Sequence, residues 1–271
     1  MKSEVFNGQR FWSYFKYDFV QMWRNNMKAS VGIGLSGLIA YIVVVAFSLI
    51  FGAGWNGPGV IPRFVVFMLA FAALELYQTR TYGYLTDRRK GSAWLMNPAS
   101  SFEKWLSMII MTIIVIPVAF LSVYLLTDLV VTSLDPTTGS SMLHSIGGGF
   151  REITEELAKV NAEYSTTWSP WAFVPAALMG CACNFMYFLL CGICFKRYKI
   201  LYGLVITFLI SFLFSILLSQ FGMQYINMEI EEFADAEQYI RSVFNISMWV
   251  SFIMTIGIAA GIFYRIKTIK H

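Results

Sequence analysis

The stretch Trp105–Thr127 reads WLSMIIMTIIVIPVAFLSVYLLT and contains no charged residue. An α-helix rises about 1.5 Å per residue, so a run of this length covers the hydrocarbon core of a bilayer, which is about 30 Å thick. Four other uncharged runs have a similar length, and each predicts a membrane-spanning helix. They are Val31–Phe51, Trp171–Phe195, Ile200–Gln220 and Ser242–Tyr264.

The composition of the whole chain is typical of a membrane protein. Of its 271 residues, 57% are hydrophobic and 13% are charged, whereas soluble domains carry about 25% charged residues. The net charge of +4 comes from short basic clusters between apolar blocks, without the basic stripe that binds nucleic acid. We therefore predict one all-α transmembrane domain over residues 1–271, with the lipid bilayer and no nucleic acid as a partner.

A sixth predicted span, Pro62–Leu85, is the least hydrophobic, because its uncharged stretch covers only residues 64–74. The distribution of basic residues nevertheless requires a crossing here. With six spans, sixteen of the 20 Lys and Arg residues lie on one side of the membrane. That side holds residues 1–30, 78–104, 196–199 and 265–271. The positive-inside rule makes it cytoplasmic, so we expect a multi-pass protein of the bacterial cytoplasmic (inner) membrane with both termini inside.

Three segments outside these spans have helical patterns of their own. Residues 10–25 interleave aromatic residues and cations, a composition that suits the headgroup zone, and predict an interfacial amphipathic helix. The external loops 132–170 and 221–241 are acidic. Apolar residues at helical spacing within each loop predict a short external helix.

The loop between the second and third spans, residues 86–104, has the most specific sequence. It is a basic turn followed by a short apolar stub, a proline and a predicted capping box from Ser100 to Glu103. Any loop that joins two spans must turn and cap, so these features also fit an ordinary connector. The string Arg88-x-x-Gly91-x-x-x-Leu95-x-x-Pro98-x-Ser100-x-x-Glu103, however, resembles the corresponding loop of type-2 ATP-binding-cassette exporter permeases.

This resemblance implies a function and partners. In that family the loop forms a coupling helix that docks on a separate ATPase subunit, and the permease acts as a homodimer or with a paralogue. ATP and Mg²⁺ would be bound by the partner, since this chain has no Gly-x-x-x-x-Gly-Lys-Ser/Thr motif. The acidic loop 221–241 departs from the re-entrant helices of the family. The residues assigned to the coupling loop are Arg88, Arg89, Gly91, Trp94, Leu95, Pro98, Ser100 and Glu103.

Glu75 is the chief ionisable residue within a predicted span. Gln78 and Thr79 follow at i+3 and i+4, on the same helical face, and Arg80 comes next. The sequence thus predicts an intramembrane polar cluster, which either lines a cavity or makes hydrogen bonds between helices. Two other functions remain open: a proton-coupled secondary transporter that uses Glu75, and a non-transporting scaffold or sensor whose acidic loops bind a ligand.

The sequence predicts neither an enzyme active site nor a metal site. No paired carboxylates or Ser–His pair are expected at one depth. All four cysteines lie within Cys181–Cys194, but Cys181 and Cys183 would point about 200° apart on a helix, whereas a tetrahedral site needs convergent ligands. We interpret these cysteines as packing residues.

Overall fold

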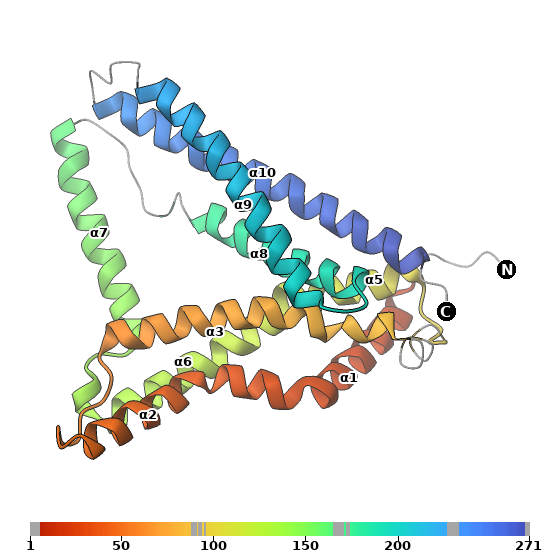
Figure 1. The fold of residues 1–271 in the computed structure, drawn as a ribbon, viewed down its shortest axis with the longest axis horizontal. Coiled ribbons are helices and arrows are strands. Elements are labelled where there is room, and N and C mark those ends of the chain that lie inside the picture. Colours follow the sequence, from red (N-terminus) through yellow and green to blue (C-terminus); the bar gives the residue numbers. More distant parts are fainter. Residues whose placement is uncertain are drawn as a thin grey trace.

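The computed structural model describes residues 6–87, 91, 94, 96–164, 171, 174–226 and 233–268. Within these ranges the regular structure is helical, without a strand (Figure 1). In chain order the helices are α1 (Gly8–Gly34), α2 (Ser36–Ile50), α3 (Val60–Thr81), η1 (Gly83–Thr86), α5 (Ser101–Ile110), η2 (Met111–Val115), α6 (Ile116–Leu134), η3 (Pro136–Thr138), α7 (Met142–Tyr164), α8 (Val174–Cys194), α9 (Lys199–Ile226) and α10 (Phe233–Thr268). The predicted all-α class is confirmed for this part of the chain.

Four stretches of helix in the described ranges are long and apolar enough to cross a membrane. They are Val60–Thr86, Ser101–Leu134, Val174–Cys194 and Asn245–Thr268. Two further apolar helices, Ser36–Ile50 and Lys199–Leu213, are shorter. All six overlap predicted spans, and the first includes the segment with the weakest hydrophobicity. Helices able to cross a membrane are therefore present, while six crossings stay a prediction.

The segments that we predict to be cytoplasmic gather at one end of the bundle. Figure 1 places the start of α1, η1, the start of α5 and the end of α10 together. The turn between α2 and α3 lies at the opposite end, with η3. These segments therefore lie at one end of the described structure, while the side of the membrane that they face stays a prediction.

The predicted division between an interfacial helix over 10–25 and a span over 31–51 needs correction. A single helix, α1, continues to Gly34, and the chain kinks at Leu35 before α2 begins. Helices bend readily at Gly and Ser, and Gly34, Ser36 and Gly37 flank this kink. A Cβ atom on Gly34 would lie 3.0 Å from Val123 of α6, so the missing side chain also lets α1 approach α6 closely.

A widened turn interrupts the long helix that contains the sequence quoted at the outset. Residues Met111–Val115 form the π-helical turn η2, in which the N–H of Ile116 donates to the carbonyl of Met111. Pro117 follows directly and has no N–H, so the carbonyl of Ile113 lacks its α-helical donor. Hydrophobicity alone gave no sign of this turn.

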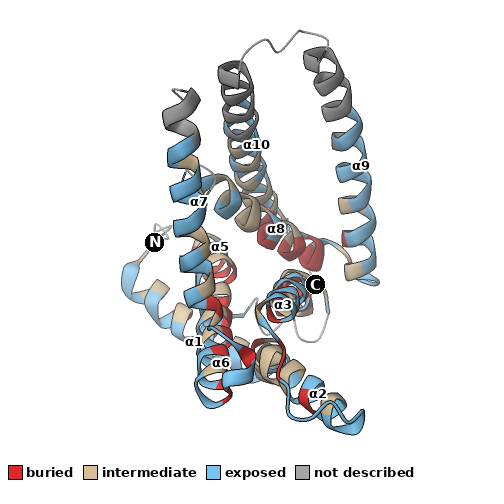
Figure 2. Cartoon of the chain, turned by 90° about the vertical axis from the view of Figure 1, so that its left-hand side faces the viewer, coloured by how far each residue is buried: buried red, intermediate tan, exposed pale blue. Residues whose placement is uncertain are grey.

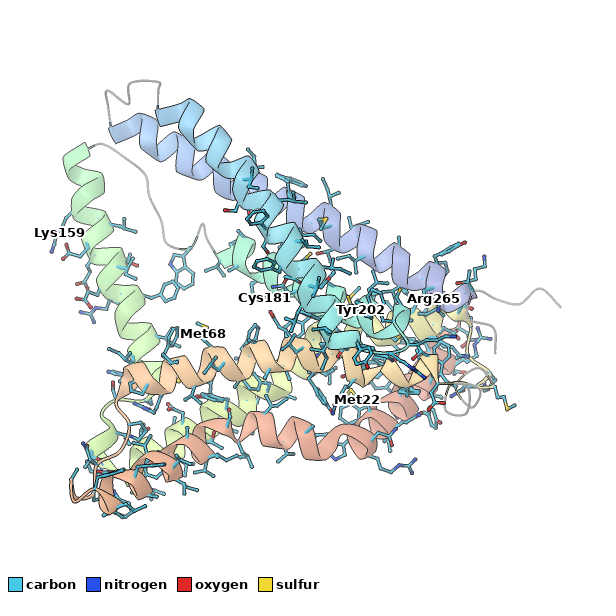
Figure 3. The ribbon with its side chains drawn as sticks, in the orientation of Figure 1. Met22, Met68, Lys159, Cys181, Tyr202 and Arg265 are labelled. Carbon is cyan, nitrogen blue, oxygen red and sulfur yellow. The ribbon has the colours of Figure 1, made fainter. Side chains whose placement is uncertain are left out.

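One predicted external loop contains a helix of its own, and the other contains the ends of two longer helices. Helix α7 occupies much of the loop 132–170, and Figure 3 shows Lys159 on a part of α7 that stands away from the bundle. In the loop 221–241 we predicted a separate helix. Instead, α9 continues to Ile226 and α10 begins at Phe233, while residues 227–232 lie outside the described ranges.

The buried core lies where α3, α5, α6 and α8 meet, as the red segments of Figure 2 show. Tyr82, Met108 and Leu189 belong to one cluster, toward the end that holds η1. A Cβ atom added to Gly192 of α8 would lie 2.5 Å from a backbone oxygen of α3. The missing side chain therefore lets these two helices pack backbone to backbone.

Candidate functional site

Glu103 joins α1, the 86–104 loop and α5 through one buried carboxylate. Its side chain is 0% exposed and accepts hydrogen bonds from Arg10 Nε at 2.8 Å and Nη2 at 2.8 Å. The N–H groups of Asn7 and Ser100 also donate to it, at 2.9 and 2.8 Å. The N–H of Glu103 donates back to Ser100 Oγ at 3.2 Å. The predicted capping box is therefore present, and it carries an ion pair to the first helix that the sequence did not suggest.

Trp94 makes a second connection between the loop and the helices. Its side chain is 3% exposed, and its indole N–H donates to the Tyr14 hydroxyl of α1 at 2.9 Å. From α5, Lys104 Nζ donates to the Trp94 carbonyl at 3.0 Å and lies 4.6 Å from the centre of its ring. The loop is thus held on both sides, by α1 and by α5.

Asp18 forms a third connection, deeper in the bundle. It is 2% exposed and accepts hydrogen bonds from Tyr82 Oη at 2.7 Å and Ser107 Oγ at 2.6 Å. Burial raises the pKa of Asp18, although both hydrogen bonds act in the opposite direction. The short helix η1, which follows α3, is held to the start of α9 by Lys199. The ammonium of Lys199 donates to the Gly83 carbonyl and the Thr86 hydroxyl.

A surface groove of about 450 Å³ lies beside these connections, between α1 and the loop. Its α1 wall contains Arg10, Ser13 and Tyr17, and its loop wall is formed by residues 96–99. Met96 is 83% exposed. An anchored loop with an exposed apolar side chain at its tip is suited to contact another protein.

The structure describes five of the eight residues assigned to the coupling loop. Gly91 is buried, and its N–H donates to the Asp87 carbonyl at 2.8 Å. Trp94, Ser100 and Glu103 form the contacts given above, and Pro98 lines the groove. Arg88, Arg89 and Leu95 lie outside the described residues.

The members of the predicted polar cluster, Glu75, Gln78, Thr79 and Arg80, differ in burial and in hydrogen bonding. Glu75 is half-buried and hydrogen-bonded to the side chain of Asn184 on α8. Thr79 is buried and donates to the carbonyl of Leu76 within its own helix at 2.7 Å. Gln78 is 0% exposed, whereas Arg80 is exposed. The hydrogen bond between Glu75 and α8 fits the interhelical alternative, while a shared site of all four residues stays a prediction.

A buried ion pair at the opposite end of the bundle escaped the sequence analysis. Arg63 of α3 pairs with Asp128 of α6, and both side chains are 5% exposed. Asp128 also accepts from the N–H of Met142 at 2.7 Å, and Arg63 donates to the carbonyl of Ser140 at 2.6 Å. The only sequence signal was that each residue lies next to an apolar run on the predicted external side.

The cysteines of α8 are all free. Among the residues described, no group of three or more His, Cys, Asp or Glu side chains is arranged to hold a metal ion. Comparisons with protein families, with characterised proteins and with solved structures find no match to this chain.

Proposed function

We propose that this chain is the transmembrane permease subunit of an ATP-driven exporter of the ATP-binding-cassette type. The sequence of the 86–104 loop supports this proposal through its resemblance to coupling loops. The observation that carries it further is the anchoring of that loop by Trp94 and Glu103 to α1 and α5 at once. A displacement of the loop by a partner would move both helices, because buried hydrogen bonds join them.

The proposed mechanism needs a partner for its energy. Two copies, or one copy and a paralogue, would form the pathway, each with residues 87–101 in a groove of a cytoplasmic ATPase dimer. ATP and Mg²⁺ would be bound there, and closure of the dimer would push the loop. Pro98 and the Ser100 cap stiffen the loop, so the push would reach the helices and turn the pathway from one side to the other.

Co-expression and co-purification with candidate ATP-binding-cassette ATPase subunits from the same genome test the proposal. Met96→Glu adds a charge at an exposed apolar side chain of the loop, and it should weaken ATPase association and lower ATP turnover. Leu143→Glu makes the same kind of change on α7, where the side chain is 59% exposed, and should have no effect. If the Met96→Glu protein retains normal association and turnover, the loop is not the ATPase contact.

A proton-coupled secondary transporter is the second candidate, because Glu75 lies within a span and contacts Asn184. Such a protein would transport without an ATPase, and Glu75→Gln would abolish that transport. Transport that depends on the ATPase and survives Glu75→Gln would exclude this second function.

A further inference from the structure

An apolar cavity of about 100 Å³ lies between α1, α3 and α6. Its walls include Phe19, Met22, Trp23 and Gly34 of α1, Leu74 of α3 and Ala119 of α6. Met22 is labelled in Figure 3. None of the side chains that line the cavity is charged, so nothing in its wall would recognise a charged ligand.

The shape and chemistry of the cavity suit a hydrocarbon chain. An enclosed cavity of about 150 Å³ lined by Leu, Ile and Phe binds benzene, and the wall of this cavity is likewise apolar, so it offers favourable contacts to hydrocarbon. On α1 the lining residues extend from Phe19 to Gly34, about 22 Å of helix. Ala119 is exposed and Trp23 is 47% exposed. The cavity therefore lies along α1 and is open at the surface of the bundle, where lipid would surround a membrane-spanning chain.

One described cation, Lys16, precedes the lining residues of α1 on the side of the predicted headgroup region. Lys16 is exposed, and its ammonium lies 5.5 Å from the centre of the Trp12 ring. It precedes Trp23 by seven residues, which places it on the same helical face, about 10 Å nearer the start of α1. Basic side chains near the membrane surface attract anionic lipids.

We propose that the cavity between α1, α3 and α6 binds an acyl chain of an anionic phospholipid, whose phosphate is held by Lys16. The lipid belongs to the leaflet that contains the start of α1. This site does not depend on an ATPase partner, so it stands or falls separately from the permease function.

Electron-spin resonance of the full chain in nanodiscs tests this site. The discs contain equal parts of phosphatidylcholine and phosphatidylglycerol, and a spin-labelled chain on either lipid reports how many lipids are motionally restricted. Ala119→Phe fills the cavity and should remove a restricted phosphatidylglycerol. Ala72→Phe makes the same change on an exposed position of α3 away from the cavity and should not.

The headgroup is tested in the same discs. Lys16→Gln should lower the preference for phosphatidylglycerol over phosphatidylcholine about fivefold, which corresponds to the roughly 1 kcal/mol that one cation contributes near anionic lipid. Lys267→Gln, at an exposed cation near the end of α10, should leave that preference unchanged. Equal effects of Lys16→Gln and Lys267→Gln would overturn the assignment of the phosphate.

A separate result would refute the binding of an acyl chain in the cavity. It is wrong if Ala119→Phe and Ala72→Phe restrict the same number of lipids. Should Ala119→Phe fail to fold, native mass spectrometry of the unaltered chain decides. Retention of phosphatidylglycerol over phosphatidylcholine is then expected, and equal retention of both lipids, or of neither, overturns the proposal.

Discussion

Glu103→Ala tests whether α1, the loop and α5 form one mechanical unit. Removing one partner of a buried ion pair costs about 3–5 kcal/mol, and the loss of a helix cap costs about 1 kcal/mol. Arg10 is 37% exposed and can be rehydrated when Glu103 is lost, which lowers the first figure. We therefore expect the variant to reduce the free energy of unfolding by about 3 kcal/mol.

Equilibrium unfolding in mixed micelles with increasing dodecyl sulfate, followed by circular dichroism, measures this change. Glu103→Gln keeps the size and one acceptor oxygen but loses the charge, so its effect should be intermediate. The matched control is Glu155→Gln on α7, where Glu155 pairs with Arg151 and the two side chains are 60% and 82% exposed. This exposed pair should contribute less than about 0.5 kcal/mol.

One result would refute the conclusion that Glu103 joins α1, the 86–104 loop and α5. If Glu103→Ala changes the free energy of unfolding as little as Glu155→Gln, α1 is not anchored through this carboxylate. The proposed transmission from the loop to α1 would then lose its structural basis, even if an ATPase binds the loop.

Three further predictions concern other buried groups. Asp128→Asn should destabilise the chain more than replacing Arg63 and Asp128 together by Met and Leu, because a lone buried charge costs more than an absent pair. The free energy of unfolding of the wild type should fall as pH rises from about 4, the ordinary pKa of Asp, through the raised pKa of Asp18, because the folded state binds the Asp18 proton more tightly than the unfolded state. Asp18→Asn should remove this loss of stability. Gly192→Ala should cost about 1–3 kcal/mol by separating α3 from α8, whereas Gly180→Ala, in open space on the same helix, should not.

Each of these outcomes is measured by the same unfolding titration, with pH varied for Asp18. A double variant of Arg63 and Asp128 that is less stable than Asp128→Asn would contradict the first prediction. A parallel pH dependence in wild type and Asp18→Asn would contradict the second. Equal stability of Gly192→Ala and Gly180→Ala would show that the close contact between α3 and α8 relaxes at little cost.

The positions of the helices could be predicted because they depend on local properties of the chain. The absence of charge over Trp105–Thr127 and the side-to-side distribution of Lys and Arg need no knowledge of contacts. The Ser100–Glu103 capping box is equally local, since both residues belong to one turn. The segment Pro62–Leu85 lies in a helix, Val60–Thr86, that is long and apolar enough to cross a membrane. Its charged and polar residues are accommodated because α3 buries part of its polar surface against α8 and α6.

The contacts that join α1, the 86–104 loop and α5 could not be predicted, because they connect residues far apart in the sequence. Arg10 and Glu103 are separated by 93 positions, and Tyr14 and Trp94 by 80. Each residue by itself fits its local role, as an interfacial cation, an interfacial aromatic residue or a helix cap. Only the packing of α1 across the start of α5 turns these separate roles into one anchored loop.

The packing register also places polar residues of different helices at one depth. The rings of Phe71 and Phe120 lie 6.2 Å apart. Farther along, the hydroxyl groups of Tyr82 and Ser107 meet on Asp18. These two contacts fix how α3 runs against the helix formed by α5, η2 and α6, in opposite directions and with matching levels.

Gln78 lies seven residues beyond Phe71, and Thr112 lies eight residues before Phe120, so both are displaced by about 10–12 Å from the ring contact. They therefore share one depth, and both are 0% exposed. The side-chain N and O atoms of Gln78 and the hydroxyl of Thr112 have no hydrogen-bond partner in the part of the chain that the structure describes. Gln78 and Thr112 thus lie at one level of the bundle, although they belong to different helices. Because the π-helical turn η2 shifts every later residue of its helix, this shared level depends on tertiary register and on that turn. Spacing along one helix contains neither.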